Sequence, residues 1–104
     1  MEPQQAVFAA LADPTRRAVL RAVAQGEAST ATGIAAGLPI SRQAVAKHLA
    51  QLERAQLVDA RREGRETRFE ATPAPLTGAI AWMTDVGAQW DARLAALAKA
   101  VRAD

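Results

Sequence analysis

The chain contains no cysteine and no tyrosine, and His48 is its only histidine. Without cysteine it can form no disulfide, no thiolate metal site and no thiol nucleophile. Its two serines are Ser29 and Ser41, and Ser41 precedes His48 by seven residues. On a helix that spacing is about 10 Å along the axis, too far for a hydrogen bond between a nucleophile and its base. No pair of acids has a recognisable spacing either, so the residues predict a protein that is not an enzyme.

Long apolar runs are also missing. No segment approaches the roughly 18 apolar residues that cross a bilayer, and the N-terminus lacks the basic and apolar regions of a signal peptide. We therefore expect a cytoplasmic protein without membrane contact. With 104 residues, 50% of them hydrophobic, residues 1–104 should form one domain with a modest core. A domain of this size buries only about two-thirds of its unfolded surface, so a second copy of the chain is a natural source of further burial.

The formal net charge of +2 is unevenly distributed. Residues 1–40 hold three basic and three acidic residues, and residues 71–104 also hold three of each. The whole excess lies in residues 41–70, which hold seven basic residues and five acidic ones. A solvated charged face is the ordinary interpretation of such a run. The alternative is a surface that is offered to an anionic partner.

The first three helices are predicted from apolar spacing and from capping signals. Residues 4–11 have large apolar residues three and four positions apart, which indicates a short helix. Asp13 followed by Pro14 is typical of the start of a second helix. A third, short helix follows within TATGIAAG, with Ser29 or Thr30 as its N-cap.

The stretch ISRQAVAKHLAQLERAQLV predicts a fourth helix, capped by Ser41, with two unlike faces. Val45, Leu49 and Leu52 fall within about 60° of one another on a helical wheel. The polar residues that cluster on the opposite side are Gln43, Lys47 and Arg54. We expect one face of this helix to pack on the core and the other to remain free.

Residues 58–71, VDARREGRETRFEA, are expected to form a β-hairpin. We predict a turn at Glu63 and Gly64, because the opposite residues are then matched in charge or hydrophobicity. The pairs in this register are Arg62 with Arg65, Arg61 with Glu66, Asp59 with Arg68, and Val58 with Phe69. A turn at Gly64 and Arg65 would instead oppose two pairs of acids. The arginine pair at the predicted tip is unfavourable by itself and favourable beside a phosphate.

From Pro75 a single long helix is predicted to run to about residue 101, with an apolar stripe about seven turns long. So small a domain cannot cover this stripe, so we expect it to pair with the same helix of a second subunit. The residues that we assign to this dimer interface are Val7, Phe8, Leu11, Ile80, Met83, Trp90, Leu94 and Leu97. Trp82 and Trp90 could instead line a ligand pocket, but packing is the simpler interpretation.

The predicted fold is mainly α-helical with a small β-hairpin: a winged helix-turn-helix of five helices plus a two-stranded wing. The segments LADPTRRAVLRAV and GLPISRQAVAKHLAQLERAQLVDARREGRETRFEA resemble the ArsR/SmtB family of bacterial transcriptional repressors across residues 7–71. The segment PLTGAIAWMTDVGAQWDARLAALAKAV is similar to the last helix of the branch that lacks metal ligands and is often encoded beside an SRPBCC-type protein.

The resemblance implies that the fourth helix enters the major groove of DNA and that the hairpin tip reaches the backbone or the minor groove. The residues assigned to DNA binding, by the resemblance or by the helical wheel, are Ser41, Arg42, Gln43, Ala46, Lys47, Arg54, Arg62 and Arg65. The expected function is that of a homodimeric, sequence-specific repressor on a pseudo-palindromic operator. The alternative is a winged-helix module for protein contacts, but such a module has no reason to confine its positive excess to this helix and hairpin.

Repressors of the family that this chain resembles are known largely for sensing metals, but we expect no metal site and no cofactor here. The third helix offers no ligand for a soft metal, and the C-terminal segment offers only carboxylates, from Asp85, Asp91 and Asp104. Zinc and copper favour sulfur and imidazole, and His48 has no companion histidine. Regulation would then depend on an organic effector between the long helices, on a partner protein or on expression level.

Overall fold

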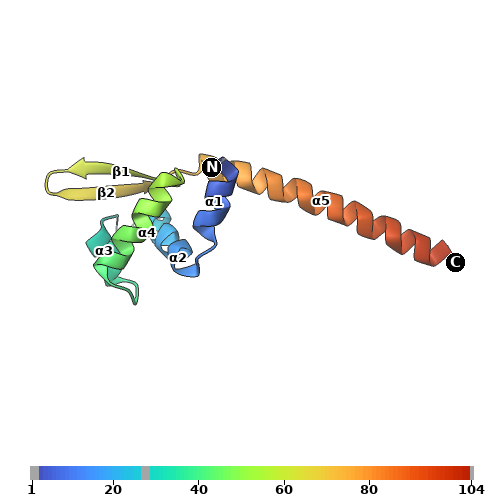
Figure 1. The fold of residues 1–104 in the computed structure, drawn as a ribbon, viewed down its shortest axis with the longest axis horizontal. Helices are drawn as coiled ribbons and strands as arrows, with labels where there is room; N and C mark the ends of the chain where they lie inside the picture. The colour runs from blue at the N-terminus through green and yellow to red at the C-terminus, as the bar shows by residue number, and fades with distance from the viewer. Residues whose placement is uncertain (1–2, 27–28, 104) are drawn as a thin grey trace.

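The computed structural model describes residues 3–26 and 29–103 of the chain. Its elements are, in order, α1 (Pro3–Leu11), α2 (Pro14–Gln25), α3 (Ala31–Ala36), α4 (Arg42–Arg54), β1 (Val58–Glu63), β2 (Glu66–Ala71) and α5 (Ala74–Ala103). Helices α1 to α4 form a small body, from which the hairpin projects on one side and α5 on the other (Figure 1). This arrangement confirms the predicted winged helix-turn-helix.

Side-chain caps begin α2, α3 and α4 where the sequence predicts them. Asp13 accepts hydrogen bonds from the backbone N–H groups of Thr15 (2.8 Å) and Arg16 (3.3 Å), which lower the pKa of its carboxyl below the usual range. Of the two candidates for the third helix, Thr30 is the cap, since its Oγ1 accepts from Gly33 N at 3.0 Å. Ser41 Oγ accepts from Ala44 N at 3.1 Å and fixes the first residue of α4.

The core is built around the apolar face of α4. Val45, Leu49 and Leu52 are each fully buried, as the helical wheel predicts. They share one core with apolar residues from α1, α2, α3, the segment after α4, the start of β1 and α5, namely Val7, Ala10, Val19, Leu20, Val23, Ile34, Ala55, Leu57, Val58 and Ala79. Because one side of α4 is held in this core, its opposite side faces outward along the whole helix.

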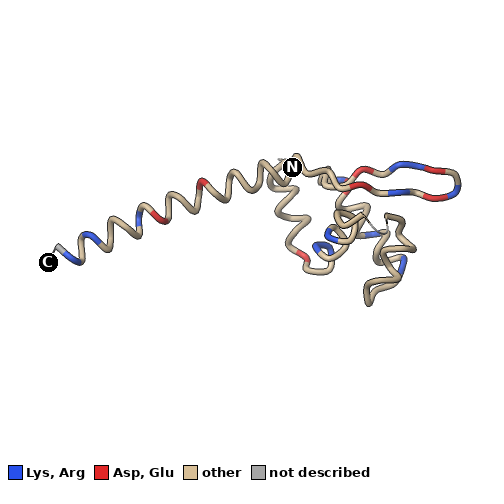
Figure 2. Tube along the Cα trace, turned by 180° about the vertical axis from the view of Figure 1, so that it is seen from behind, with Lys and Arg blue, Asp and Glu red and all other residues tan. Residues whose placement is uncertain are grey.

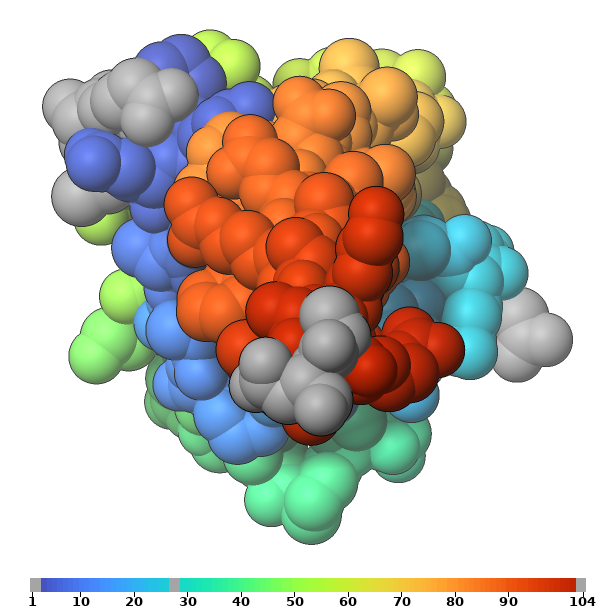
Figure 3. Space-filling model, turned by 90° about the vertical axis from the view of Figure 1, so that its right-hand side faces the viewer, coloured from blue at the N-terminus to red at the C-terminus, as the bar shows by residue number. Residues whose placement is uncertain are grey.

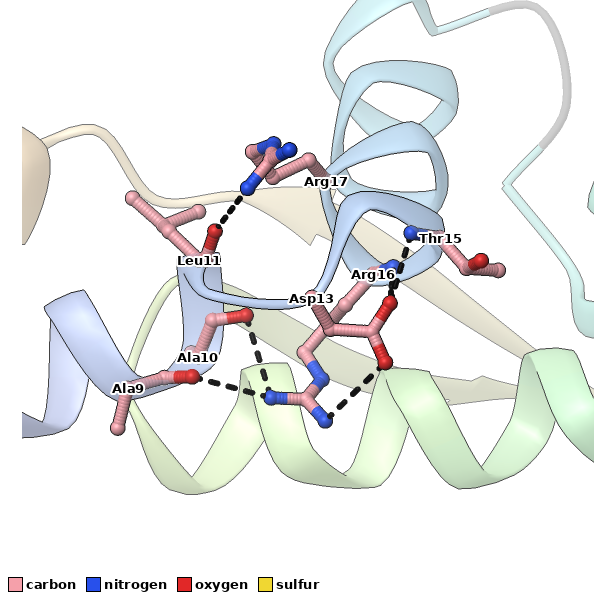
Figure 4. Close-up of polar contacts among 7 residues, drawn as sticks. All are labelled: Ala9, Ala10, Leu11, Asp13, Thr15, Arg16 and Arg17. Carbon is pink, nitrogen blue, oxygen red and sulfur yellow. Dashed lines mark hydrogen bonds and ion pairs between the residues drawn. The ribbon is translucent and has the colours of Figure 1, made fainter.

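The corner between α1 and α2 is held by two arginines (Figure 4). Arg16 Nη1 donates to the carbonyl oxygens of Ala9 (3.3 Å) and Ala10 (3.2 Å), and Arg17 Nη1 donates to that of Leu11 (2.6 Å). The last carbonyl groups of a helix have no partner within it, so these guanidinium groups both satisfy them and complement the helix dipole. The contacts hold α1, which in turn supports α5.

The junction between α4 and the hairpin contains a strained residue. Gln56 has φ 63°, the left-handed region that favours glycine. Its N–H donates to Glu53 O (2.9 Å), and that of Leu57 donates to Leu52 O (3.0 Å). This hydrogen-bond pair is a Schellman motif, which also brings the buried side chains of Leu52 and Leu57 to the same helix end. The fold therefore holds a glutamine where glycine is usual.

The hairpin register differs from our prediction, which was wrong. The structure pairs Val58 with Ala71, Asp59 with Glu70, Ala60 with Phe69, Arg61 with Arg68, Arg62 with Thr67, and Glu63 with Glu66. The turn therefore lies at Gly64 and Arg65, and Gly64 has φ 60°. Both two-residue turns common in hairpins require a positive φ at their first central residue. The predicted turn would have placed Glu63 there, a conformation that costs a residue with a Cβ much more than glycine.

Ion pairs with neighbours on the same face offset part of the repulsion within the like-charged pairs of this register. On one face of the hairpin an acidic pair, a basic pair and a second acidic pair follow one another. Arg68 lies 2.9 Å from Glu63 and 3.2 Å from Glu66, and Arg61 lies 3.3 Å from Glu63 and 3.8 Å from Glu70. We call this face, formed by Asp59, Arg61, Glu63, Glu66, Arg68 and Glu70, the ladder face. The alternation of charge along the hairpin is visible in Figure 2.

The hairpin is tied to the segment before α3. Arg68 Nη1 donates to Ser29 Oγ at 3.2 Å, and the backbone N–H of Phe69 donates to Ser29 O at 2.9 Å. The half-buried ring of Phe69 packs against the core beside these bonds. These contacts fix the position of the hairpin relative to the segment before α3.

Within the described residues, α1 lies beside the first turns of α5 (Figure 3), and the rest of α5 projects away from the body. Gln4 Nε2 donates to Gly78 O at 3.2 Å, and the rings of Phe8 and Trp82 stand 5.5 Å apart between centroids. Ala79 is 1% exposed and marks the side of α5 that faces the body. Val7, which we had assigned to a dimer interface, is 1% exposed and belongs to the core.

Replacement of Gln56 by glycine should stabilise the protein, because it relieves the strain of a left-handed residue that carries a Cβ. We expect the free energy of unfolding to rise by up to about 1 kcal/mol, since the gain is partly offset by the greater freedom of glycine in the unfolded chain. Urea denaturation would measure it. Gln56→Ala keeps the Cβ and is the control, so equal stability of the two variants would contradict the explanation.

Replacement of Arg68 by alanine should loosen the hairpin, because it removes the side-chain bond to Ser29. Loss of one such bond, worth about 1 kcal/mol, should speed hydrogen exchange at the amide of Phe69 about fivefold. The matched control is Arg61→Ala, which removes an arginine from the same ladder face but no bond to Ser29. Similar acceleration in both variants would show that the brace lies elsewhere.

Candidate nucleic-acid interface

The first turns of α4 present polar side chains on the side opposite the core. Ser41, Arg42, Gln43, Ala46 and Lys47 are all exposed. Residues 41–52 contain no acidic side chain, and the N-terminal end of a helix carries partial positive charge. This surface is therefore suited to a negatively charged partner, and its donors and acceptors are of the kinds that read base edges.

A cleft of about 650 Å³ separates α3 and α4 from the hairpin. Its lining residues are Thr30, Ala31, Thr32, Gly33, Arg42, Ala46, Arg62, Arg65, Glu66, Thr67 and Phe69. The cleft thus brings together two predicted residues of α4 and the two predicted arginines of the hairpin. Sequence reasoning missed Thr32, Thr67 and Phe69, because their place in the cleft depends on the register and on how the hairpin folds over α3.

Two of the cleft arginines are held by bonds from Nε, which leave their terminal amino groups available. Arg42 Nε donates to Thr32 Oγ1 at 3.1 Å, and Arg62 Nε donates to Gly64 O at 3.0 Å. The bond to α3 directs Arg42 toward the cleft rather than toward Gln43 and Lys47. The predicted pairing of Arg62 with Arg65 across the tip does not occur, since Arg62 lies opposite Thr67, but both arginines line the cleft.

Arg54 lies far from the other residues that were predicted to bind DNA. It lies in the last turn of α4, about 18 Å along the axis from Arg42, and it does not line the cleft. Its positive charge complements the C-terminal end of the helix dipole. The arrangement around the cleft therefore does not include it.

A second exposed surface consists of apolar side chains on α5. Helix α5 has 30 residues, so it is about 45 Å long and extends well beyond helices α1 to α4. We call its exposed side chains the α5 stripe, formed by Ile80 (58% exposed), Met83 (50%), Trp90 (56%), Leu94 (58%), Leu97 (62%) and Val101 (67%). Trp82 is 50% exposed beside it. Figure 1 shows the outer half of α5 projecting away from the other elements, and Figure 3 looks at it from the C-terminal end.

The residues considered for other chemistry are scattered. Among the described residues, no group of three or more histidine, aspartate or glutamate side chains could hold a metal ion. His48 is half-buried at the edge of the α4 core face, and its Nδ1 makes no hydrogen bond within residues 3–26 and 29–103.

Arg93 lies over the ring of Trp90, 5.7 Å from the centroid. None of the described helices is long and apolar enough to cross a membrane.

Comparison with known proteins identifies similar regulators. A family model described as a helix-turn-helix domain matches residues 11–61. The chain is 37% identical over 92 residues to the HTH-type transcriptional regulator Rv2034 of Mycobacterium tuberculosis, covering 88% of this chain and 82% of that protein. It is 34% identical over 77 residues to the transcriptional repressor SdpR of Bacillus subtilis, covering 74% of this chain and 84% of that one.

Solved structures share the architecture. An ArsR-like transcriptional regulator from Rhodococcus sp. RHA1 is 41% identical, with a TM-score of 0.77 over 91% of this chain and 89% of that chain. The homodimeric winged helix-turn-helix DNA-binding domain Mb0332 from Mycobacterium bovis is 26% identical, with a TM-score of 0.65 over 84% of this chain and 80% of that chain. Both likenesses cover a larger share of the chain than residues 11–61, which the family model matches.

Proposed function

Since the chain belongs to the ArsR family of winged helix-turn-helix transcriptional regulators, we propose that it is a homodimeric repressor that binds a pseudo-palindromic operator. The observation that carries the proposal is the convergence of exposed α4 residues with Arg62 and Arg65 around one cleft. In each half-site, α4 enters the major groove and the hairpin reaches the adjacent backbone. Bound at a promoter, in the cytoplasm where the bacterial chromosome lies, the protein excludes polymerase.

The α5 stripe supports the dimer. The side chains of its outer half are more than half exposed, and an apolar strip of this length is rarely left in water. Two copies related by a twofold axis can cover both stripes with one self-complementary interface. The half-buried Phe8, whose ring lies against that of Trp82, and the half-buried Leu11 extend the proposed surface onto α1. The homodimeric assembly named for the similar Mycobacterium bovis domain and the repressor activity named for SdpR agree with the proposal.

Geometry sets a further requirement on the operator. Two recognition helices related by a twofold axis meet successive major grooves on one side of the duplex, about 34–36 Å apart, or a multiple of that spacing. We also propose that this member is not a metal sensor, because its residues offer carboxylates and one imidazole rather than sulfur ligands. Any regulation then depends on an organic ligand or on a partner protein.

A module for protein contacts remains the alternative function. It would explain the α5 stripe but not the absence of acids from the exposed side of α4 before Glu53. A gel-shift assay with the region upstream of the protein's own gene distinguishes the two. A shift that survives excess unrelated DNA supports the repressor, and no shift at low salt supports the module.

Substitution of Leu94 by glutamate should convert the dimer to a folded monomer, because it places a charge in the α5 stripe at a side chain that is 58% exposed in the single chain. Sedimentation velocity would measure the mass, and circular dichroism the helix content. Ala92→Glu, which lies on the opposite side of α5, is the matched control and should remain dimeric. A Leu94→Glu variant that sediments as a dimer would place the interface elsewhere.

Two single variants should distinguish a residue that contacts phosphates from a residue that contacts bases. Arg65→Ala should weaken binding to selected and mixed-sequence DNA alike and make the dependence of log Kd on log salt less steep. Gln43→Ala should mainly relax the preference at particular base pairs, by about 1–3 kcal/mol per contact. Fluorescence anisotropy on both duplexes at several salt concentrations would measure this, and equal losses on both duplexes for Gln43→Ala would argue against base reading.

A further inference from the structure

We infer that the cleft between α4 and the hairpin is a site for a phosphodiester group of the DNA backbone, held by Arg42, Arg62 and Arg65. The inference rests on the proposed function and deepens it, because it changes the role of Arg42. The family resemblance places Arg42 with Gln43 and Lys47 among the residues that face the major groove, without dividing them between bases and phosphates. The structure separates it from them.

The first step is the direction of the Arg42 guanidinium. Its Nε is bound to Thr32 Oγ1 at 3.1 Å, so the plane of the group is fixed against α3 at the cleft wall. The two terminal amino groups have no hydrogen bond to a described residue, and a pair of amino groups matches two oxygens of a phosphate. Arg62 is held in a comparable way, through Nε to Gly64 O at 3.0 Å.

The second step is the separation of charge between the two faces of the hairpin. Arg62 and Thr67 form one cross-strand pair on the face that lines the cleft. The ladder face carries four acids and two arginines, and it lies on the other side of the strands. Glu66 borders the cleft, but its carboxylate is bound by Arg68 at 3.2 Å. An anion is therefore favoured within the cleft and disfavoured on the ladder face.

The third step is the fit of the cleft to its ligand. The cleft is open to solvent, with residues 30–33 at the start of α3 and the small side chain of Ala46 at its wall. The proposed docking places α4 in the major groove and the hairpin across the adjacent strand, so the strand between them must pass this opening. Contacts to that strand position the protein on DNA and carry no sequence information, whereas Gln43 and Lys47 remain free for base edges.

The test compares Arg42→Ala with Arg61→Ala, which removes the same charge from the ladder face. Each is titrated over a range of NaCl concentrations with a mixed-sequence duplex and with a duplex that the wild-type protein selects from a random pool. For Arg42→Ala the slope of log Kd against log salt should fall by about 0.9 per protomer, about 1.8 for a dimer, with the same loss on both duplexes. Arg61→Ala should keep the wild-type slope, and Arg42→Lys should retain most of it.

A second measurement identifies the phosphate itself. Methylphosphonate groups are introduced singly along the selected duplex, each of which removes one backbone charge. At one position in each half-site, the methylphosphonate should weaken binding of the wild-type protein but cause no further loss of binding for Arg42→Ala. Additive losses at every position would overturn the inference.

The outcomes for the two proposals are distinct. If Arg42→Ala loses affinity only for the selected duplex, with an unchanged salt slope, Arg42 is a base reader; the phosphate site is wrong and the repressor stands. If the wild type selects no sequence but Arg42→Ala still flattens the slope, the phosphate site stands and sequence-specific repression is wrong. A wild-type protein that binds neither duplex at low salt overturns both.

Discussion

The burial of one face of α4 is the constraint on which the rest of the structure depends. Val45, Leu49 and Leu52 are fully enclosed by the other helices and the start of β1, and each such side chain contributes about 1.5–3 kcal/mol. Rotation of α4 about its axis would expose them, so the orientation of the helix is fixed. The same burial therefore decides which side chains of α4 face outward, away from the core.

The hairpin depends on that helix for its position and on its own turn for its register. The strained Gln56 directs the chain out of α4, and Ser29 braces Phe69 and Arg68. Exposed ion pairs are individually weak, yet on the ladder face they offset part of the repulsion between the like-charged residues. The same register directs Arg62 into the cleft. Charge is thus sorted between the two faces of one hairpin, which a net charge of +2 does not reveal.

Helix α5 shows how far apolar spacing alone can be interpreted. The stripe and its length were predicted from residues three and four positions apart, and the structure leaves it exposed. Val7 was predicted to lie in the dimer interface, but it is buried in the core. Spacing alone cannot tell which apolar side chains of a short helix belong to the core and which to an interface. Arg54 illustrates the same problem on α4: the helical wheel groups it with Gln43 and Lys47, but the wheel omits the distance along the axis.

The sequence by itself determined the order of the elements, the caps at Asp13 and Ser41, the buried face of α4 and the family. These depend on local periodicity and on backbone donors within a few residues of the cap. A local signal for the hairpin turn was also present, since glycine is the residue suited to a positive φ at the first central position. Only the tertiary structure decided that Arg42 turns toward the cleft, because its partner Thr32 lies ten residues away on another helix. It also decided the composition of the cleft, because three separate elements meet there through contacts that no local pattern encodes.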